Sequence, residues 1–385
     1  MNTEQEHAQD EGDRDGKDED EDVVRIMIGI LGTMLALVCG LVLLQTSNKS
    51  TSHSRSLSQA SQTVDDDAPA PAAATTTTHH NGDSSASRFL PDPQHEPSKR
   101  AYEVFVLWYT PVWIMCFGAI IGCHWYEHFT DYDYLGVCGG LALPLLLQPV
   151  LWPGGVPRLD PAYYHSSQDV VAVVLSPDHA RPLHQRYALK ANVWLAVYSF
   201  IGNYWYTHYF YSVLQARYTM PSHRFNNVPI PLYFATHFYF STYHVFSNLV
   251  LRKIHTTYTP SVARTLLWWT TIGTFAYVTA FLETLTISAY PDYAFADRTM
   301  AYTIGSAFYG IYFVVSFPAF YSFDPTIDRT TTKNNSSSRR SPTLWETIVF
   351  SCGYGMMILI LLDFVRLYLD IPLIVGSSMA EICPS

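Results

Sequence analysis

Long apolar runs recur along the chain after residue 100. Each is close to the ~20 residues that a helix needs to cross the hydrocarbon core of a bilayer, and each carries few charged side chains or none. The pattern predicts an all-α polytopic membrane protein with a bundle of about seven transmembrane helices. The predicted spans are residues 104–123, 134–152, 191–214, 228–251, 265–290, 299–323 and 344–369.

A separate apolar run, residues 26–44, follows an acidic N-terminal stretch. It predicts a retained membrane anchor, because a cleaved signal peptide would begin with basic residues. Composition divides the rest of the chain. The expected parts are an acidic disordered tail (1–22), the N-terminal transmembrane anchor (23–45), a disordered Ser/Thr/Ala/Pro linker (46–100), the helical bundle (101–370) and a short tail (371–385).

One predicted span, residues 228–251, carries a polar stripe in an otherwise apolar and aromatic segment. Its members recur at spacings of four, three and four, which places them on one face of a helix. Polar side chains in a membrane helix usually face the bundle interior or a cavity, so the stripe predicts an interior lining. It consists of His237, Ser241, His244 and Asn248.

Glu283 is the one acidic residue in the span 265–290. A charged side chain at the centre of a membrane helix costs ~2.5–3.5 kcal/mol on insertion scales, so apolar surroundings favour the neutral carboxylic acid. A neutral acid in a dry pocket is a proton donor for a weak base. The alternative is a carboxyl group that only joins helices through hydrogen bonds.

The span 191–214 is dense in aromatic residues. Asn203 and Thr207 share one helical face, while Tyr204 and His208 share the neighbouring face. Aromatic rings attract a desolvated cation by ~2 kcal/mol or more, although such rings are also ordinary packing residues.

Lys and Arg gather in alternate loops, which predicts that the linker is cytosolic and the C-terminus lumenal or external. Arg217 and Arg224 break this pattern, because their loop should lie on the non-cytosolic side. The exception indicates either a loop folded onto a site or a tolerated irregularity.

Several function classes lack their sequence signals. The net charge of −10 comes mainly from residues 1–22, and no basic patch indicates nucleic acid. The chain has no P-loop, no GxGxxG or GxSxG motif, and no CxxC or zinc-finger spacing among its six cysteines. We therefore expect no cofactor, no metal site and no nucleic-acid partner, and the lipid bilayer is the expected surrounding. The function classes that remain compatible with the sequence are proton-transfer chemistry and ligand binding.

Five segments together resemble the cycloeucalenol cycloisomerase family, the cyclopropyl sterol isomerases. In chain order they read GNYWYTHYFYSVL, PSHRFNNVP, THFYFSTYHVFSNLVLRK, FLETLTISAYPDYAFADR and GSAFYGIYFVVSFPAF. The resemblance is close over 190–323, looser over 102–189 and 344–370, and absent from 1–100. The acidic leader and the anchor depart from the family pattern, which bears on targeting and not on chemistry.

The resemblance implies that the chain opens the 9β,19-cyclopropane ring of a sterol in the endoplasmic reticulum membrane. Cycloeucalenol would become obtusifoliol without redox change or cofactor. Protonation at C19 leaves positive charge at C9, and loss of the C8 proton then gives the 8-ene. This chemistry needs an acid, a base and a dry cavity.

For these roles the sequence offers several candidates. Glu283 is the candidate proton donor, assisted by His237 or His244, and His208 is an alternative acid or base. Candidate rings for stabilising the cation are Tyr204, Tyr209, Tyr309 and Tyr312. Candidates for holding the 3-hydroxyl group are Asn226, Asn227 and Asn248, and Asn203 is a further substrate-binding candidate.

Two other functions would suit the same pattern. One is a non-catalytic sterol-binding or sensing protein on this scaffold. The other is a seven-helix transporter or receptor. A transporter often shows internal repeats or broken helices at matching positions. Pro111, Pro144 and Pro318 lie in predicted spans at no matching offsets, which favours the isomerase.

Overall fold

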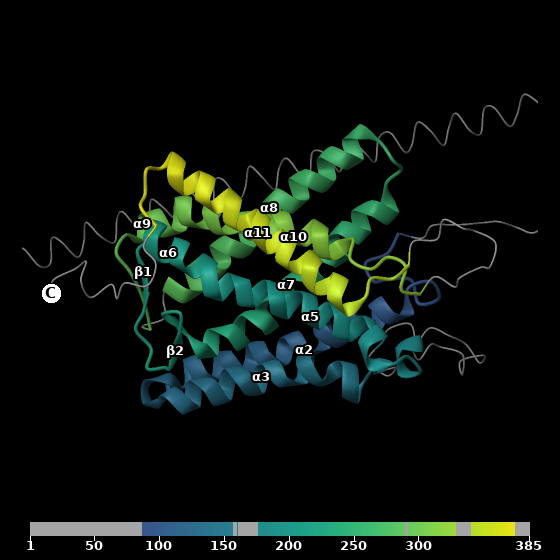
Figure 1. Ribbon diagram of the computed structural model, residues 1–385, viewed down its shortest axis with the longest axis horizontal. Helices are drawn as coiled ribbons and strands as arrows, with labels where there is room; N and C mark the ends of the chain where they lie inside the picture. Colours follow the sequence, from purple (N-terminus) through teal and green to yellow (C-terminus); the bar gives the residue numbers. More distant parts are fainter. Residues whose placement is uncertain (1–86, 157–159, 161–175, 289–291, 329–339, 374–385) are drawn as a thin grey trace, which may run out of the picture.

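The computed structural model describes residues 87–156, 160, 176–288, 292–328 and 340–373. The predicted acidic tail and anchor lie outside these residues, as do most of the predicted linker and the end of the short tail. The described part is a bundle of long helices with small sheets at one end (Figure 1). The long helices are α2 (Pro97–Gly122), α3 (Asp131–Leu151), α5 (Tyr187–Ile201), α7 (Ile230–Thr257), α8 (Val262–Ser288), α10 (Ser306–Tyr321) and α11 (Leu344–Tyr368).

Within the described residues, each of the seven predicted spans lies mostly in helix, and five segments are long and apolar enough to cross a membrane. The other two predicted spans, 191–214 and 228–251, form α5 with α6 (Thr207–Val213) and α7. Both lie in the middle of the bundle, where α7 contacts α2, α3, α5, α8 and α10 (Figure 1). Their polar residues therefore face protein, which explains why they are less apolar than the outer helices. The five membrane-compatible segments are Pro97–Gly122, Asp131–Leu151, Val262–Thr286, Arg298–Tyr321 and Leu344–Tyr368.

Two of the predicted spans each contain one turn of π-helix. The segment η6 (Gly202–Tyr206) joins α5 to α6, and η7 (Ala301–Gly305) joins the short helix α9 (Arg298–Met300) to α10. A π turn inserts an extra residue and shifts the facing of the side chains that follow it, and such turns are frequent at functional sites.

The interior is filled by interlocking aromatic rings. Trp194 of α5 stacks on Tyr198 at 5.1 Å and meets Phe320 of α10 at 5.3 Å between ring centroids. Because lipid is as apolar as the helix surfaces, close packing rather than the hydrophobic effect holds membrane helices together. Each such ring pair contributes about 0.5–1.5 kcal/mol beyond its buried area.

Two antiparallel sheets lie at the end of the bundle that is on the left in Figure 1. Strand β1 (Ala216–Tyr218) pairs with β4 (Tyr293–Phe295), and β2 (Arg224–Phe225) pairs with β3 (Val228–Pro229). The turn between β2 and β3 is formed by Asn226 and Asn227, with φ of 51° and 60°. Positive φ at both positions is the requirement of a tight type I′ hairpin, which asparagine tolerates.

Buried ion pairs lie near the start of α2 and the end of α7. Arg252 forms two 2.8 Å hydrogen bonds to the Glu103 carboxylate, and Asn248 donates a third at 2.9 Å. Arg252 also donates to the carbonyl of Phe89 at 2.6 Å. Residues 87–100, which fell in the predicted linker, thus contact the bundle.

Candidate active site

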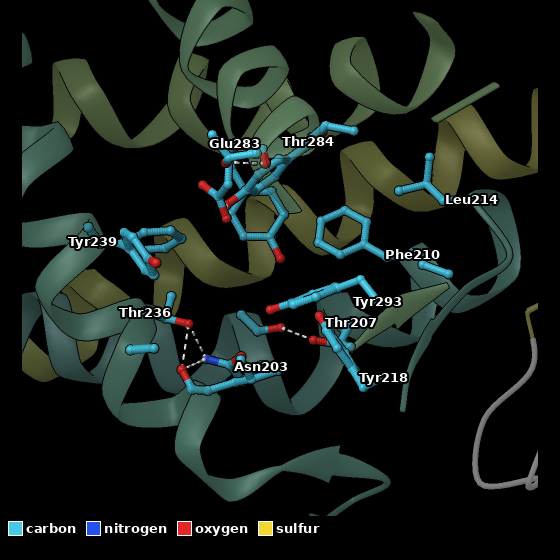
Figure 2. A pocket seen from close by; sticks show the side chains of 18 of the residues that line it. Asn203, Thr207, Phe210, Leu214, Tyr218, Thr236, Tyr239, Glu283, Thr284 and Tyr293 are labelled. Carbon is cyan, nitrogen blue, oxygen red and sulfur yellow. Dashed lines mark hydrogen bonds between the residues drawn. The ribbon is translucent and has the colours of Figure 1, made fainter. Parts of the chain in front are cut away.

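A cavity of about 150 Å³ lies between α7, α8, α10 and the π turn η6, next to the β1–β4 sheet (Figure 2). Its wall combines six tyrosines with threonines, aliphatic residues and a single carboxyl group. An apolar cavity of this volume holds a single six-membered ring such as benzene. The polar and aromatic members of the lining are Asn203, Thr207, Phe210, Tyr218, Thr236, Tyr239, Phe240, Tyr243, Glu283, Thr284, Thr286, Tyr293, Phe295, Tyr309 and Tyr312.

Glu283 brings that carboxyl group from the second half of α8. The Tyr309 hydroxyl of α10 lies 2.9 Å from each carboxyl oxygen and donates to them. The Tyr243 side chain of α7 also hydrogen-bonds Glu283. Among the described residues that line the cavity there is no Lys, Arg or His, so the other titratable side chains of this lining are phenols.

Asn203 and Thr236 lie on the opposite side of the cavity from Glu283 (Figure 2). The Asn203 amide nitrogen donates to the Thr236 hydroxyl at 2.9 Å and to the Ser199 carbonyl at 3.0 Å. Asn203 belongs to the π turn η6, whose extra residue presents this amide to α7.

The β1–β4 sheet closes one side of the cavity. Tyr218 and Tyr293 face each other across the sheet with ring centroids 5.0 Å apart, and both line the cavity. Burial raises the pKa of the Tyr218 hydroxyl, and the nearby Glu283 carboxyl acts in the same direction. The Tyr218 phenol therefore stays protonated.

The loop with the two unexpected arginines is folded onto this site. Arg217 lies in β1 opposite Ala294, and the Arg224 guanidinium donates to the Tyr218 carbonyl at 2.6 Å. Of the two interpretations of these arginines, the structure favours the loop folded onto a site.

The candidate histidines do not line the cavity in the described structure. His237 is buried and shares a 3.0 Å hydrogen bond with Asn192 of α5. His244 is buried among aromatic rings, and its Nδ1 lies 2.7 Å from the Phe240 carbonyl. His208 is buried in α6 and hydrogen-bonds Asn226.

The other candidates divide between the cavity and structural positions. Asn203, Tyr309 and Tyr312 line the cavity. The ring of Tyr204 packs on Phe200 and Phe225, and Tyr209 packs on Phe308. The three candidates for the 3-hydroxyl group lie elsewhere. Asn226 and Asn227 form the β2–β3 turn, and Asn248 hydrogen-bonds Glu103 of the buried ion pair.

The sequence pattern did not reveal the cavity face of α7. Thr236, Tyr239 and Tyr243 lie there, at spacings of three and four, and form a second helical stripe beside the histidine stripe. The signal was present as a repeat of hydroxyl-bearing residues, but it is hidden among the many other aromatic residues of the segment. Tyr218 and Tyr293 carried no such periodic signal, because they come from short strands.

Comparison with known proteins identifies a relative that is similar to most of this chain. It is 36% identical over 312 residues to a protein of Arabidopsis thaliana named cycloeucalenol cycloisomerase, and the match covers 78% of this chain and 97% of that protein. No protein-family model matches the chain, and no solved structure matches it. By its identity to that relative over nearly the relative's whole length, the chain belongs to the cycloeucalenol cycloisomerase family.

Proposed function

We propose that this membrane protein opens the 9β,19-cyclopropane ring of a 4-methylsterol, converting cycloeucalenol into obtusifoliol in the endoplasmic reticulum membrane. The name and identity of the Arabidopsis relative support the reaction class. The observation that carries the proposal is a single carboxyl group, Glu283, in a cavity otherwise lined by phenols, hydroxyls, apolar groups and the amide of Asn203. Such a site supplies a proton donor and little else that is reactive.

Glu283 is the proton donor in this proposal. Its neutral carboxyl group gives its proton to C19, the C9–C19 bond breaks, and its electron pair forms the new C19–H bond. Positive charge develops at C9, and the carboxylate remains beside it. The Tyr309 hydroxyl, 2.9 Å from both oxygens, stabilises that carboxylate as the charge forms.

The same carboxylate is the base that closes the reaction. The C8–H bond breaks, its electron pair forms the C8=C9 double bond, and the proton returns to Glu283. The reaction then neither gains nor loses a proton overall, because Glu283 donates one proton to C19 and accepts one from C8. Because the three candidate histidines lie outside the described cavity lining, we assign them no proton transfer.

The aromatic wall supports the cation. The Tyr309 and Tyr312 rings lie 5.4 Å apart by centroid, and Phe210 lies 5.2 Å from Tyr309. Ring faces attract positive charge most strongly where water is absent. A dry wall also keeps water from capturing the cation, which would give an alcohol instead of an alkene.

The proposal is tested by incubating membranes that contain the protein with cycloeucalenol in heavy water. We expect an 8-ene sterol that carries deuterium in its new C19 methyl group, because the carboxyl proton exchanges with solvent between turnovers. A saturable sterol-binding signal with unchanged cycloeucalenol would instead identify a non-catalytic binding protein and refute the proposal.

A further inference from the structure

Resting on the proposed function, we propose that the cavity receives ring A of the sterol and that the Asn203 side-chain oxygen accepts a hydrogen bond from the 3-hydroxyl group. Asn203 is then the residue that orients the substrate toward Glu283.

The orientation of the Asn203 amide is set by its neighbours. Its nitrogen donates to the Ser199 carbonyl, which can only accept, so the NH₂ group must face that side. The second N–H goes to the Thr236 hydroxyl, which itself donates to the Leu232 carbonyl at 2.7 Å. Both amide protons are thus occupied by protein.

The Asn203 oxygen is left as an acceptor. Asn203 is 6% exposed and lines the cavity, and no residue in the described part of the chain donates to its Oδ1. Because this oxygen faces a cavity and has no protein donor, a ligand that brings a donor gains a hydrogen bond there. A sterol hydroxyl is such a donor, whereas a ketone is not.

The shape of the site matches this assignment. In the sterol, C3 and C10 are opposite corners of ring A, and C19 is bonded to C10. Glu283 and Asn203 lie on opposite sides of the cavity (Figure 2). The volume of about 150 Å³ suits one ring rather than four. Ring A therefore spans the cavity, with C19 toward the acid and the hydroxyl group toward the amide, and the remaining rings extend beyond it.

The test compares cycloeucalenol with its 3-ketone, using kcat/KM for wild type, Asn203→Leu and Thr236→Val. Wild type should prefer the hydroxyl substrate by about 10- to 100-fold. Asn203→Leu should reduce this preference to about 1, since leucine cannot accept a hydrogen bond. Thr236→Val removes an amide contact but keeps the acceptor, so it should retain most of the preference.

The outcomes separate this inference from the proposed function. If wild type converts both sterols equally well, or if Asn203→Leu keeps the full preference, the assignment of Asn203 is wrong while the isomerase activity stands. Equal loss of preference in Asn203→Leu and Thr236→Val would show that helix packing sets the selectivity, and would also overturn it. If wild type converts neither sterol, the proposed function fails first. Should Asn203→Leu not fold, equal conversion of both sterols by wild type would still overturn the assignment.

Discussion

At the scale of single residues, the site depends on one acid and the phenol that holds it. The sequence indicated Glu283 because an acid inside an apolar span is costly unless it has a role. It also offered Tyr309, but only as a ring. The structure shows that the Tyr309 hydroxyl, rather than its ring alone, contacts the acid.

The hydroxyl can be tested separately from the ring. Tyr309→Phe keeps the ring but removes the donor to both Glu283 oxygens. Because a hydrogen bond to a charged group is worth about 1.5–3 kcal/mol, kcat should fall about 10- to 100-fold with little change in KM. Tyr368→Phe is the matched control, since Tyr368 is exposed at the end of α11. An unchanged kcat in Tyr309→Phe would mean that this hydroxyl does not stabilise the carboxylate during reaction.

The histidine stripe shows where residue patterns mislead. The pattern correctly placed His237 and His244 inside the bundle, because buried polar residues recur on one helical face. It did not reveal which neighbouring helix that face meets. The stripe meets α2, α5 and α10, whereas the adjacent face, with Tyr239 and Tyr243, borders the cavity.

At the scale of elements, the helices were predictable and their π turns were not. The long apolar runs gave the helix positions, because helices and closed β-barrels are the only structures that span a membrane. A π turn differs from an α turn by one residue, and its stability comes from tertiary contacts that a pattern does not encode. Here Tyr206, within η6, donates to the Gly355 carbonyl of α11 at 2.7 Å.

The contact between η6 and α11 predicts a local stability effect. A Cβ at Gly355 would lie 2.9 Å from Ile201 Cδ1 and 3.2 Å from the Tyr206 hydroxyl, so Gly355→Ala overpacks this crossing. The free energy of unfolding should fall by about 1–3 kcal/mol, measured as a lower Tm in detergent.

The same helix supplies the control for this effect. A Cβ at Gly353 would meet nothing within 4 Å, so Gly353→Ala should leave Tm unchanged or raise it slightly through helix propensity. Equal Tm values for the two variants would show that α11 does not need a glycine to approach the π turn.

At the scale of the whole molecule, the two ends of the bundle differ in chemistry. Buried ion pairs such as Glu103–Arg252 lie near the start of α2, whereas the cavity lies toward the end with the β1–β4 sheet. Under the predicted orientation, the ion-pair end is cytosolic and the cavity end is lumenal or external. Residues from β1 and β4 complete the cavity, and sequence periodicity could not place them because these short strands are far apart in the chain and pair only in the tertiary structure.

The most direct measurement of the central claim is turnover of cycloeucalenol by Glu283→Gln in heavy water, beside Glu127→Gln as an exposed control. The glutamine keeps the shape and accepts the Tyr309 hydrogen bond, but it has no carboxyl proton to give. We expect deuterium incorporation at C19 to fall at least ~100-fold, the usual contribution of a general acid, while sterol binding persists and Glu127→Gln matches wild type. Wild-type rates of deuterium incorporation in Glu283→Gln would contradict the account, because the proton that opens the ring would then come from another group.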